Sequence, residues 1–543
     1  MKKRILLLFL LMAGISINNR IWAQTGDDYG DFPFEESYLS KDQPDHTTIV
    51  STTSGGQTDV KFTESGVQLT QADQNAFGGI FINDRRFNAR SGIVVDFEYM
   101  MYGGTGGDGL SIFFFDNEVV NPTIGAKGAG IGYAFNRIWH DRTGYWDFEK
   151  FFSKGLSGGY LGIAFDIPGN FKAARFQGDA RVNGIPFGDQ YSDYYESKYN
   201  GKHDVTIRGA VGKPISNYTG TEEGYTGYPV LIAQTTKNIV SGDVNENNYF
   251  VLDSTNGRYV RKSTEHNSYR PAANMENFNF TISSGEEFKD SSDLSYRKAH
   301  IELFPIYNAD STVEEGFFIT VNITHGSVTD TVINNYEYRG EIKYLENTLS
   351  PSTQNSDYIT DGDKEKKPRI GVLQTIDATP PEFLRIGFAA STGDKTNIHT
   401  IKNLKISMLH AAEAEDDTIS INGGYPLLND KAYDGPVKQQ QTPKTENVDP
   451  NSFQFIYKEN KYTDKCVVPG QGTWIYDPDK AFVRFVPEIG FTGEATIDYN
   501  IKGKGDPYGR ESHRSIPATI VVNVPTGMST RVLTNKMVTS RPR

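Results

Sequence analysis

Two glycine-rich stretches place acidic and amide side chains where they could bind a ligand. In the first, Asp108 lies in the run Gly-Gly-Asp-Gly at 106–109, shortly before the apolar segment 112–115. In the second, Asp166 and Asn170 follow another glycine-rich apolar segment and stand four residues apart. Glycine lets a ligand approach the backbone closely, and carboxylate and amide oxygens accept hydrogen bonds from hydroxyl groups or coordinate hard cations. Together the two stretches suggest a sugar-binding site with a cation beside it.

Two other glycine patterns match known motifs but lack the structural context that those motifs need. Residues 104–109 match GxGxxG, yet a β-type segment follows where phosphate binding needs a helix N-terminus. Residues 155–159 match GxSxG, and again a strand pattern follows where a hydrolase needs a helix. The sequence therefore favours neither nucleotide binding nor a nucleophilic serine.

The elements that must position these residues are predicted to be β-strands. The chain contains 54 Gly, 30 Tyr and 33 Phe and has a mean hydropathy of -0.51, which fits many short strands joined by turns. The apolar runs within 62–115 are short and interrupted by Gly, Asn and Asp, and similar short runs stand at 298–304 and 384–390. No window of 15 or more residues carries a convincing helical stripe. The expected fold class is all-β.

The N-terminus and the bulk charge limit where the chain works and what it binds. Basic residues at 2–4 precede an apolar run at 5–17, which predicts a signal peptide over 1–23 and a secreted or cell-surface protein. No later apolar run reaches the roughly 20 residues of a membrane helix, so no membrane insertion is expected. The single cysteine, Cys466, rules out an internal disulfide framework. The net charge of -13 argues against nucleic acid and suits divalent cations or neutral glycans.

Composition divides the mature chain into two domains. Residues 413–417 are small and acidic, which marks a linker. Two stretches rich in Asn, Ser, Asp and Glu are predicted to be insertions or long loops. The predicted organisation is a first domain over 24–412 with insertions near 236–294 and 347–367, a second domain over 418–524 with strand spacings typical of an immunoglobulin-like sandwich, and a disordered tail over 525–543.

Five ordered blocks of the first domain resemble the legume-type (L-type) lectin family in its bacterial secreted branch. Each block is weak alone, but their order is informative. The blocks are 107–114, 128–133, 161–166 with Asn170, 205–209 and 384–393. This resemblance implies a concanavalin-like jelly-roll sandwich whose loops hold a sugar beside a bound calcium ion.

The resemblance also assigns roles to particular residues. Ala164 stands where plant members carry a Glu, which argues against a second transition-metal site, and Ala129 replaces one glycine of the second sugar loop. Asp179 is a possible replacement for a further metal-binding Asp, at irregular spacing. By resemblance the sugar-binding residues are Asp108, Gly128, Asn170, Gly393 and Asp394, and the calcium ligands are Asp166, Asn170 and Asp179.

The segment 418–524 resembles the sandwich repeats of fibrillar bacterial surface adhesins, which implies a spacer or stalk. The predicted function is therefore non-enzymatic glycan binding, with glycans or glycoconjugates as partners; the sequence does not indicate an oligomeric state. A glycoside hydrolase on the same fold would need two carboxylates about 5 to 9.5 Å apart, and the Glu-x-Asp-x-x-Glu motif of laminarinase-like enzymes is absent. A structural adhesin that has lost sugar binding is a third possibility, supported by Ala129 and Ala164.

Without the ordered blocks, simpler interpretations of the same residues stay open. Asp108 could be a turn aspartate that caps its own loop. Asp166 and Asn170 could form a plain turn around Pro168 and Gly169.

Overall fold

The structure is a computed structural model of the full chain, and its description covers most of the residues between 33 and 526. The predicted signal peptide and all but the first two residues of the predicted tail lie outside the described residues, as do much of 237–277 and 349–369. The described ranges are 33–50, 59–83, 85–89, 92–140, 145–171, 179–180, 203–214, 223–236, 250–253, 258–261, 278–307, 314–348, 370–409, 411–433, 443–458, 460–504, 514–515 and 517–526.

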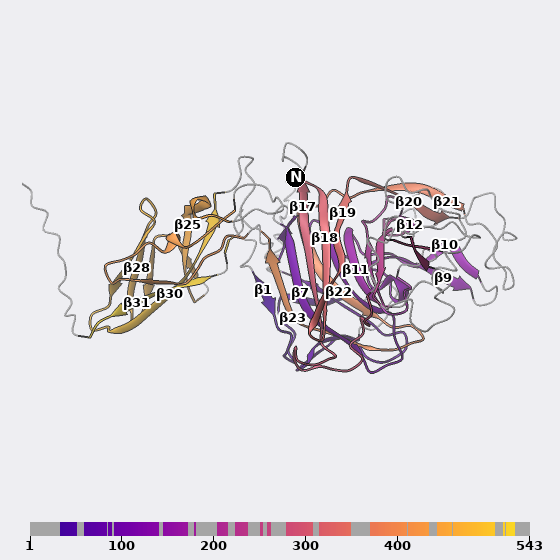
Figure 1. The fold of residues 1–543 in the computed structure, drawn as a ribbon, viewed down its shortest axis with the longest axis horizontal. Coiled ribbons are helices and arrows are strands. Elements are labelled where there is room, and N and C mark those ends of the chain that lie inside the picture. Colours follow the sequence, from indigo (N-terminus) through magenta and orange to yellow (C-terminus); the bar gives the residue numbers. More distant parts are fainter. Residues whose placement is uncertain are drawn as a thin grey trace, which may run out of the picture.

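Within these ranges the regular structure is β-strand with a few single-turn 3-10 helices, so the predicted all-β fold class is confirmed (Figure 1). The short helices are η2 (Gly128–Gly130), η4 (Pro426–Leu428) and η5 (Thr445–Asn447). None of the helices in the described part of the chain is long and apolar enough to cross a membrane.

Two large sheets, formed by strands between Phe34 and Met408, make up the N-terminal part. The first is antiparallel and has the order β19-β18-β17-β7-β23-β4-β3, with β1 beside β23. Its strands are β1 (Phe34–Glu36), β3 (Lys61–Thr63), β4 (Gly66–Thr70), β7 (Ile93–Tyr102), β17 (Arg297–Tyr307), β18 (Glu314–His325), β19 (Val328–Arg339) and β23 (Ile398–Met408).

The second sheet has the order β2-β5-β22-β8-β11-β13-β14-β12-β20-β21, with β6 beside β22. All its pairings are antiparallel except that between β12 and β14. Its strands are β2 (Thr47–Val50), β5 (Phe77–Ile82), β6 (Phe87–Asn88), β8 (Gly109–Asp116), β11 (Gly159–Asp166), β12 (Asp179–Ala180), β13 (Asp204–Arg208), β14 (Val230–Thr235), β20 (Glu341–Thr348), β21 (Ile370–Asp377) and β22 (Phe383–Ser391). Two hairpins, β9 (Asn136–His140) with β10 (Tyr145–Ser153) and β15 (Phe250–Asp253) with β16 (Arg258–Arg261), form separate two-stranded sheets.

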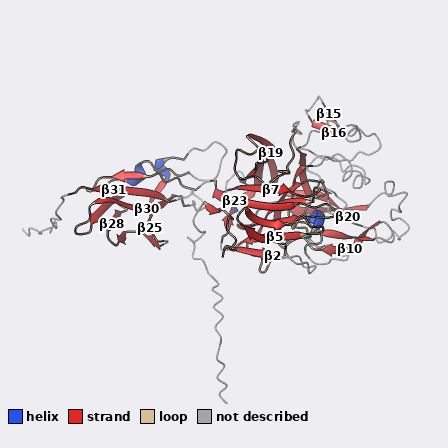
Figure 2. Ribbon diagram, turned by 90° about the horizontal axis from the view of Figure 1, so that it is seen from below, coloured by secondary structure: helices blue, strands red, loops and turns tan. Residues whose placement is uncertain are grey.

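The two large sheets form a sandwich because each supplies one apolar face to a shared core. Leu110, Ile112 and Phe114 of β8 belong to this core, where Phe97 of the first sheet meets Phe388 of the second with ring centroids 5.1 Å apart. Successive residues of a strand point to opposite faces, so one strand can serve two cores. The view in Figure 2 shows β7 and β23 in a different layer from β2 and β5. The sandwich that the resemblance implied is therefore present.

The opposite face of the second sheet is also buried, because loops cover it. Phe113 and Phe115 of β8 point to this outer face and pack with Ile131 and Tyr133 of the loop that contains η2. Every residue of β11 is buried, as expected for a strand covered on both sides. The loops that carry the candidate site residues therefore rest on an apolar layer of their own.

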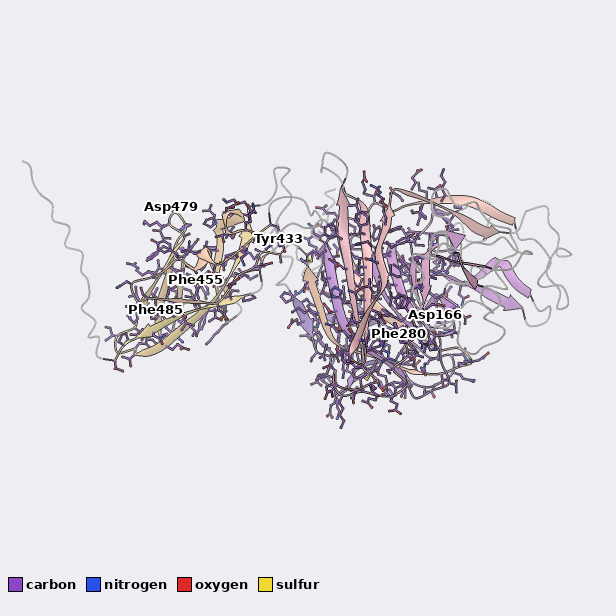
Figure 3. All side chains as sticks on the ribbon, in the orientation of Figure 1. Asp166, Phe280, Tyr433, Phe455, Asp479 and Phe485 are labelled. Carbon is purple, nitrogen blue, oxygen red and sulfur yellow. The ribbon has the colours of Figure 1, made fainter. Side chains whose placement is uncertain are left out.

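The C-terminal part contains two smaller sheets and a separate core. Phe455, Trp474 and Phe485 lie in this core, and the rings of Trp474 and Phe485 are 4.6 Å apart. Figure 3 labels Phe455 and Phe485 among these strands. The single cysteine, Cys466, is buried there as a free thiol. The five-stranded sheet has the order β24-β31-β30-β25-β26, and the three-stranded sheet has the order β27-β28-β29. Their strands are β24 (Asp417–Ile419), β25 (Val448–Tyr457), β26 (Asn460–Tyr462), β27 (Lys465–Val468), β28 (Gly472–Asp477), β29 (Phe482–Pro487), β30 (Gly493–Gly503) and β31 (Ala518–Val524).

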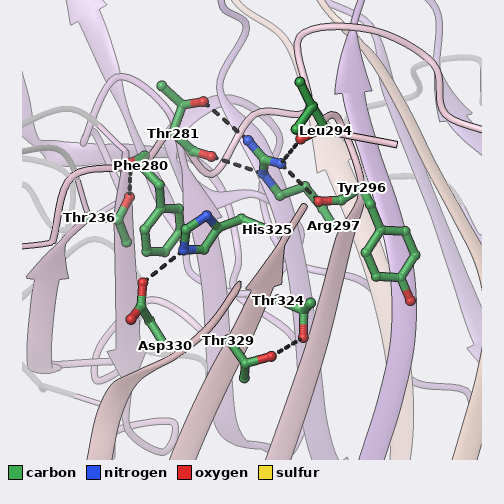
Figure 4. A network of polar contacts seen from close by, with 10 residues as sticks. All are labelled: Thr236, Phe280, Thr281, Leu294, Tyr296, Arg297, Thr324, His325, Thr329 and Asp330. Atoms are coloured by element: carbon green, nitrogen blue, oxygen red, sulfur yellow. Dashed lines mark hydrogen bonds and ion pairs between the residues drawn. The ribbon is translucent and has the colours of Figure 1, made fainter. Parts of the chain in front are cut away.

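The end of the predicted insertion near 236–294 packs onto the sandwich instead of projecting into solvent. Phe280 is buried, and its ring stacks on His325 with centroids 3.9 Å apart (Figure 4). The Arg297 guanidinium donates to the carbonyls of Thr281, Leu294 and Tyr296, which holds the loop against β17. The buried residues Phe280 and Ile282 thus anchor the end of this stretch, while the hairpin of β15 and β16 lies earlier in the same segment.

Candidate functional site

The candidate residues meet in one row across the outer face of the second sheet. Ser391 is opposite Gly109, Gly109 is opposite Asp166, and Asp166 is opposite Asp204 on the adjacent strands β22, β8, β11 and β13. Directly paired residues point to the same face of a sheet, and neighbouring strands lie about 4.8 Å apart. The predicted sugar loops and the predicted calcium strand are therefore neighbours at one end of the sheet.

Asp108 is the acid immediately before this row, and it is nearly buried at 8% exposure. Its Oδ2 atom has no hydrogen-bond partner in the described part of the chain. Burial raises the pKa of Asp108 to about 6, a hydrogen bond from the Ser391 side chain works against this rise, and the charge of Asp394 adds to it. A buried carboxylate with an unsatisfied oxygen is costly unless a ligand supplies a donor.

The loop that precedes Asp108 is fixed by a single carbonyl group. The backbone amides of Thr105, Gly106 and Gly107 all donate to the carbonyl oxygen of Thr396, at 2.8 to 3.1 Å. A Cβ at Gly104 would lie 2.0 Å from the same oxygen, so only glycine fits there. The carbonyl of Asp108 in turn accepts from the Ile167 amide at 3.0 Å. This explains why the acid lies among glycines.

The loop that contains Gly128 is tied to the same row by two buried serines. The Gly128 amide donates to Ser391 Oγ at 2.7 Å, and Ser111 Oγ donates to the Ile131 carbonyl at 2.6 Å. Gly128 has a φ of +69°, which favours glycine. Ser391 therefore links Gly128 to Asp108. The amide hydrogen of Gly128 is already donated to Ser391 and is not available to a ligand.

Gly393 and Asp394 stand in the turn between β22 and β23. The Cα of Gly393 faces Asp108, because a Cβ built on it would lie 3.5 Å from Asp108 Oδ1. A second loop supports this turn: the Asn75 amide donates to the Gly393 carbonyl at 3.1 Å, and Gln74 Nε2 donates to the Asp394 carbonyl at 2.9 Å. The structure thus brings Asp108, Gly128, Gly393 and Asp394 together, as the sequence predicted.

Asp166 organises the turn that carries Asn170. Its two carboxylate oxygens accept from the amides of Gly169 at 3.0 Å and Phe171 at 2.6 Å. The buried Arg208 holds the end of the turn, since its Nε donates to the Phe171 carbonyl at 2.8 Å. Asn170 is half-buried between two fixed residues. Its backbone is therefore held in place whether or not a metal binds.

Asp179, the third predicted metal ligand, lies elsewhere. It pairs with Val230 at the start of β14, whereas Asp204, the partner of Asp166, pairs with Thr235 at the end of β14. Five residues of a strand span roughly 17 Å. The structure does not bring Asp179 together with Asp166, and it places Asp204 there instead.

The residues around Asp166 fit a calcium ion in part. Asp166 and Asp204 are both fully buried and directly opposite each other, with Cβ atoms expected about 5 Å apart. Two buried carboxylates at this separation need a positive charge or a proton between them. Carboxylate oxygens and the Asn170 amide are ligands that calcium prefers. The described residues contain no group of three or more His, Cys, Asp or Glu side chains that could hold a metal ion, so the protein side chains supply only part of a shell.

Sequence reasoning missed Ser391 and Asp204. Ser391 lies within the block 384–393, at the end of β22, and Asp204 directly precedes the block 205–209, at the start of β13. In each case the sequence contains a usable signal, which is a polar residue at one end of an apolar strand, next to a loop. Trp139, Tyr145 and Trp146 lie on β9 and β10, whose side chains fall outside the described residues.

Comparison with known proteins returns only distant similarities. No family model matches the chain, and no curated protein matches it. Similar solved structures include the exoplasmic/lumenal domain of VIP36 in a Ca2+/Man-bound form, at 12% identity and a TM-score of 0.26 over 68% of this chain and 85% of that one. Lectin II from Ulex europaeus has 11% identity and a TM-score of 0.27 over 69% and 98% of the two chains. Lectin I-B4 from Griffonia simplicifolia, in a metal-free form, has 10% identity with the same TM-score and coverage.

Proposed function

We propose that this protein binds glycans without acting on them chemically, at a site centred on Asp108. The observation that carries the proposal is the nearly buried Asp108 carboxylate, whose Oδ2 atom has no partner in the described part of the chain. A sugar offers neighbouring hydroxyl groups that could donate to a carboxylate held this way. The sequence resemblance to L-type lectins supports the same role. The proposal rests on the geometry of Asp108 and on this resemblance, and not on the solved structures of low identity.

Binding would use loops that are already ordered. Asp108 would accept hydrogen bonds from sugar hydroxyls, and the Asn170 amide could donate to another hydroxyl. Gly393 gives the ligand access to Asp108, since a side chain there would start 3.5 Å from the carboxylate. Asp394 would line the rim of the site and tune the charge of Asp108. Because the loops hold one another through hydrogen bonds, little ordering would be needed on binding.

Calcium is the cofactor that we propose, held by Asp166, Asp204 and Asn170. A bound calcium ion would supply positive charge between the two buried carboxylates. The turn at 166–171 would present Asn170 to the sugar, because its amides already contact the Asp166 carboxylate. Asp179 is not included in this set, since the strand register places it at the other end of β14.

We further propose that the chain is exported and displays its glycan site on the cell surface or in the medium. Support comes from the basic and apolar pattern of residues 1–17. The smaller sheets between Asp417 and Val524 would form a second, immunoglobulin-like domain that acts as a spacer, since they have a core of their own. The boundary at 413–417 is part of this proposal.

Glycan hydrolysis is the alternative from another functional class. It would need two carboxylates that both reach the substrate across a cleft. The acidic pair on adjacent strands of the candidate site, Asp166 and Asp204, is fully buried, so a substrate would not reach it. Asp108 and Asp394 interact electrostatically, so an assay for released reducing ends tests whether this pair hydrolyses glycans.

The test is a glycan array probed with the full chain, with calcium and after chelation, combined with an assay for released reducing ends. We expect binding to a defined group of glycans, weaker binding after chelation, and no released reducing ends. Mannose and galactose conjugates are suitable first probes. Absence of binding on every glycan would refute the proposed function, and release of reducing ends would favour the hydrolase. Binding that chelation does not change would refute only the calcium part.

A further inference from the structure

Ser391 interacts with both the Gly128 loop and the Asp108 carboxyl group. It is the last residue of β22 and is fully buried on the outer face of the sheet. Its Oγ accepts the Gly128 amide at 2.7 Å, and its strand partner is Gly109, which directly follows Asp108, so the hydroxyl lies close enough to the Asp108 carboxyl group to lower its pKa. Three segments that are far apart in the sequence therefore meet at a single hydroxyl group.

The hydrogen-bonding capacity of a serine hydroxyl makes this arrangement directional. A hydroxyl has one hydrogen to donate and two lone pairs to accept with. Because the Gly128 amide occupies a lone pair, the hydroxyl hydrogen is free to point at the Asp108 carboxylate. That hydrogen bond stabilises the ionised form of Asp108 and opposes the effect of burial on its pKa. Oδ2, which has no partner in the described structure, is left for a ligand.

We propose that Ser391 is the positioning residue of the site, which orients and ionises Asp108, and that the Gly128 amide is a structural donor and not a sugar donor. This inference rests on the proposed glycan-binding function. It assigns Gly128 a different role from the one that resemblance suggested. Gly128 shapes the site through its backbone conformation, while recognition of the sugar is left to Asp108 and the residues around it.

Ser111 provides a matched control. It is fully buried on the adjacent strand, points to the same face, and donates to the Ile131 carbonyl of the same loop at 2.6 Å. No contact between Ser111 and Asp108 is present in the described structure. Ser111→Ala therefore removes an equivalent loop anchor without touching the acid.

The experiment measures glycan affinity against pH for four proteins: wild type, Ser391→Ala, Ser391→Thr and Ser111→Ala. We expect Ser391→Ala to lose about tenfold in affinity at pH 7.5, since a hydrogen bond to a charged group is lost. The pH at which binding is half-lost should also move upward, because Asp108 loses the group that stabilises its charge. Ser391→Thr keeps the hydroxyl and should recover the wild-type pH midpoint. Ser111→Ala should leave that midpoint unchanged.

Two outcomes would overturn the inference. Wild-type affinity and pH midpoint in Ser391→Ala would show that the hydroxyl does not position Asp108. An equal shift in Ser111→Ala would show that any loop anchor has the same effect. If wild type binds no glycan, the proposed function fails. The link between Ser391 and Asp108 is then tested by carbon-13 NMR titration of the aspartate carboxyl groups. Asp108→Asn assigns the signal of Asp108 in this titration. An unchanged Asp108 pKa in Ser391→Ala would refute it there.

Discussion

Asp108 joins two properties that normally exclude each other, burial and negative charge. Burial and the neighbouring charge of Asp394 raise its pKa to about 6, which is still low enough for the carboxylate form to dominate at neutral pH. Hydrogen bonds from sugar hydroxyls need that form as an acceptor. The position of this pKa makes the site sensitive to mild acid.

Glycan affinity should therefore decrease as pH falls through about 6. The protonated form of Asp108 is favoured in the folded protein relative to an ordinary aspartate, so the ionised form that binds sugar is present above this pKa and lost below it. At pH 5 the affinity should be about tenfold lower than at pH 7.5. Calorimetric titration at the two pH values measures this. Asp394→Asn removes the neighbouring charge and should move the midpoint downward; an affinity that is the same at both pH values would contradict the role of Asp108.

At the scale of strands and loops, Gly109 is the position where the loop that carries Asp108 meets β11, opposite Asp166. Its φ is +147°, and a Cβ there would lie 2.2 Å from the Phe165 carbonyl oxygen, a backbone atom held in the sheet. Gly109→Ala should lower the free energy of unfolding of the sandwich by about 3 kcal/mol, because the two strands must separate. Thermal unfolding of the full chain measures this.

Gly285 is the matched control for this substitution. Its φ is +77°, but a Cβ there would meet no atom within 4 Å. Gly285→Ala should cost only the conformational strain, about 1 kcal/mol. Equal destabilisation by the two variants would contradict the proposed contact between β8 and β11.

A second element-scale feature is an acidic cluster around Tyr499 in the smaller sheets. Tyr499 Oη lies 2.9 and 3.1 Å from the two oxygens of Asp430, 3.0 Å from Asp417 Oδ2 and 3.0 Å from the Glu415 carbonyl. One phenolic hydrogen cannot serve four acceptors. Burial, together with the charges of Asp417 and Glu415, raises the pKa of Asp430 to about 7.

The stability of this part should fall as pH rises. Because the folded-state pKa of Asp430 lies above the ordinary value of 3.8, its contribution is complete below about pH 4 and lost as pH rises through about 7. Between pH 5 and pH 8 the change should be on the order of 2 kcal/mol, since Asp430 titrates through about two pH units in this range. Chemical denaturation at pH 5 and pH 8 measures this. Asp430→Asn should flatten the pH dependence, and a steeper decrease at acidic pH would refute the explanation.

The strands and the first sugar loop could be predicted because their signals are local. Glycine beside an acid and a following apolar run identify Asp108 without knowledge of distant residues. Ser391 could not be assigned a role in this way, since its partner Gly128 lies 263 residues away in the sequence. Asp179 was selected for its nearness to Asp166 in the sequence, but strand register, which the sequence does not reveal, gives that place to Asp204.

At the scale of the whole molecule, the two groups of sheets have separate cores. Phe388 lies in the core between the large sheets, and Trp474 lies in the core between the small ones. Both side chains are fully buried. No strand pairing joins the two groups within the described residues.

Two independent unfolding transitions should follow from these separate cores. Phe388→Ala and Trp474→Ala should each cost about 3 to 5 kcal/mol, and each should lower a different transition in differential scanning calorimetry of the full chain. A single transition that both substitutions lower equally would contradict the division into two domains.

The central claim is that Asp108 binds sugar, and the most direct measurement compares Asp108→Asn with Asp116→Asn by calorimetric titration of the full chain with a glycan selected on the array. Asp108 directly precedes β8 and Asp116 ends it. Asp116 accepts a hydrogen bond from the Glu118 amide in its own turn and does not face the candidate site, so it gives a matched change of charge. We predict at least about a hundredfold loss of affinity for Asp108→Asn, since a charged acceptor is removed, and wild-type affinity for Asp116→Asn. Undiminished binding by Asp108→Asn would contradict the claim.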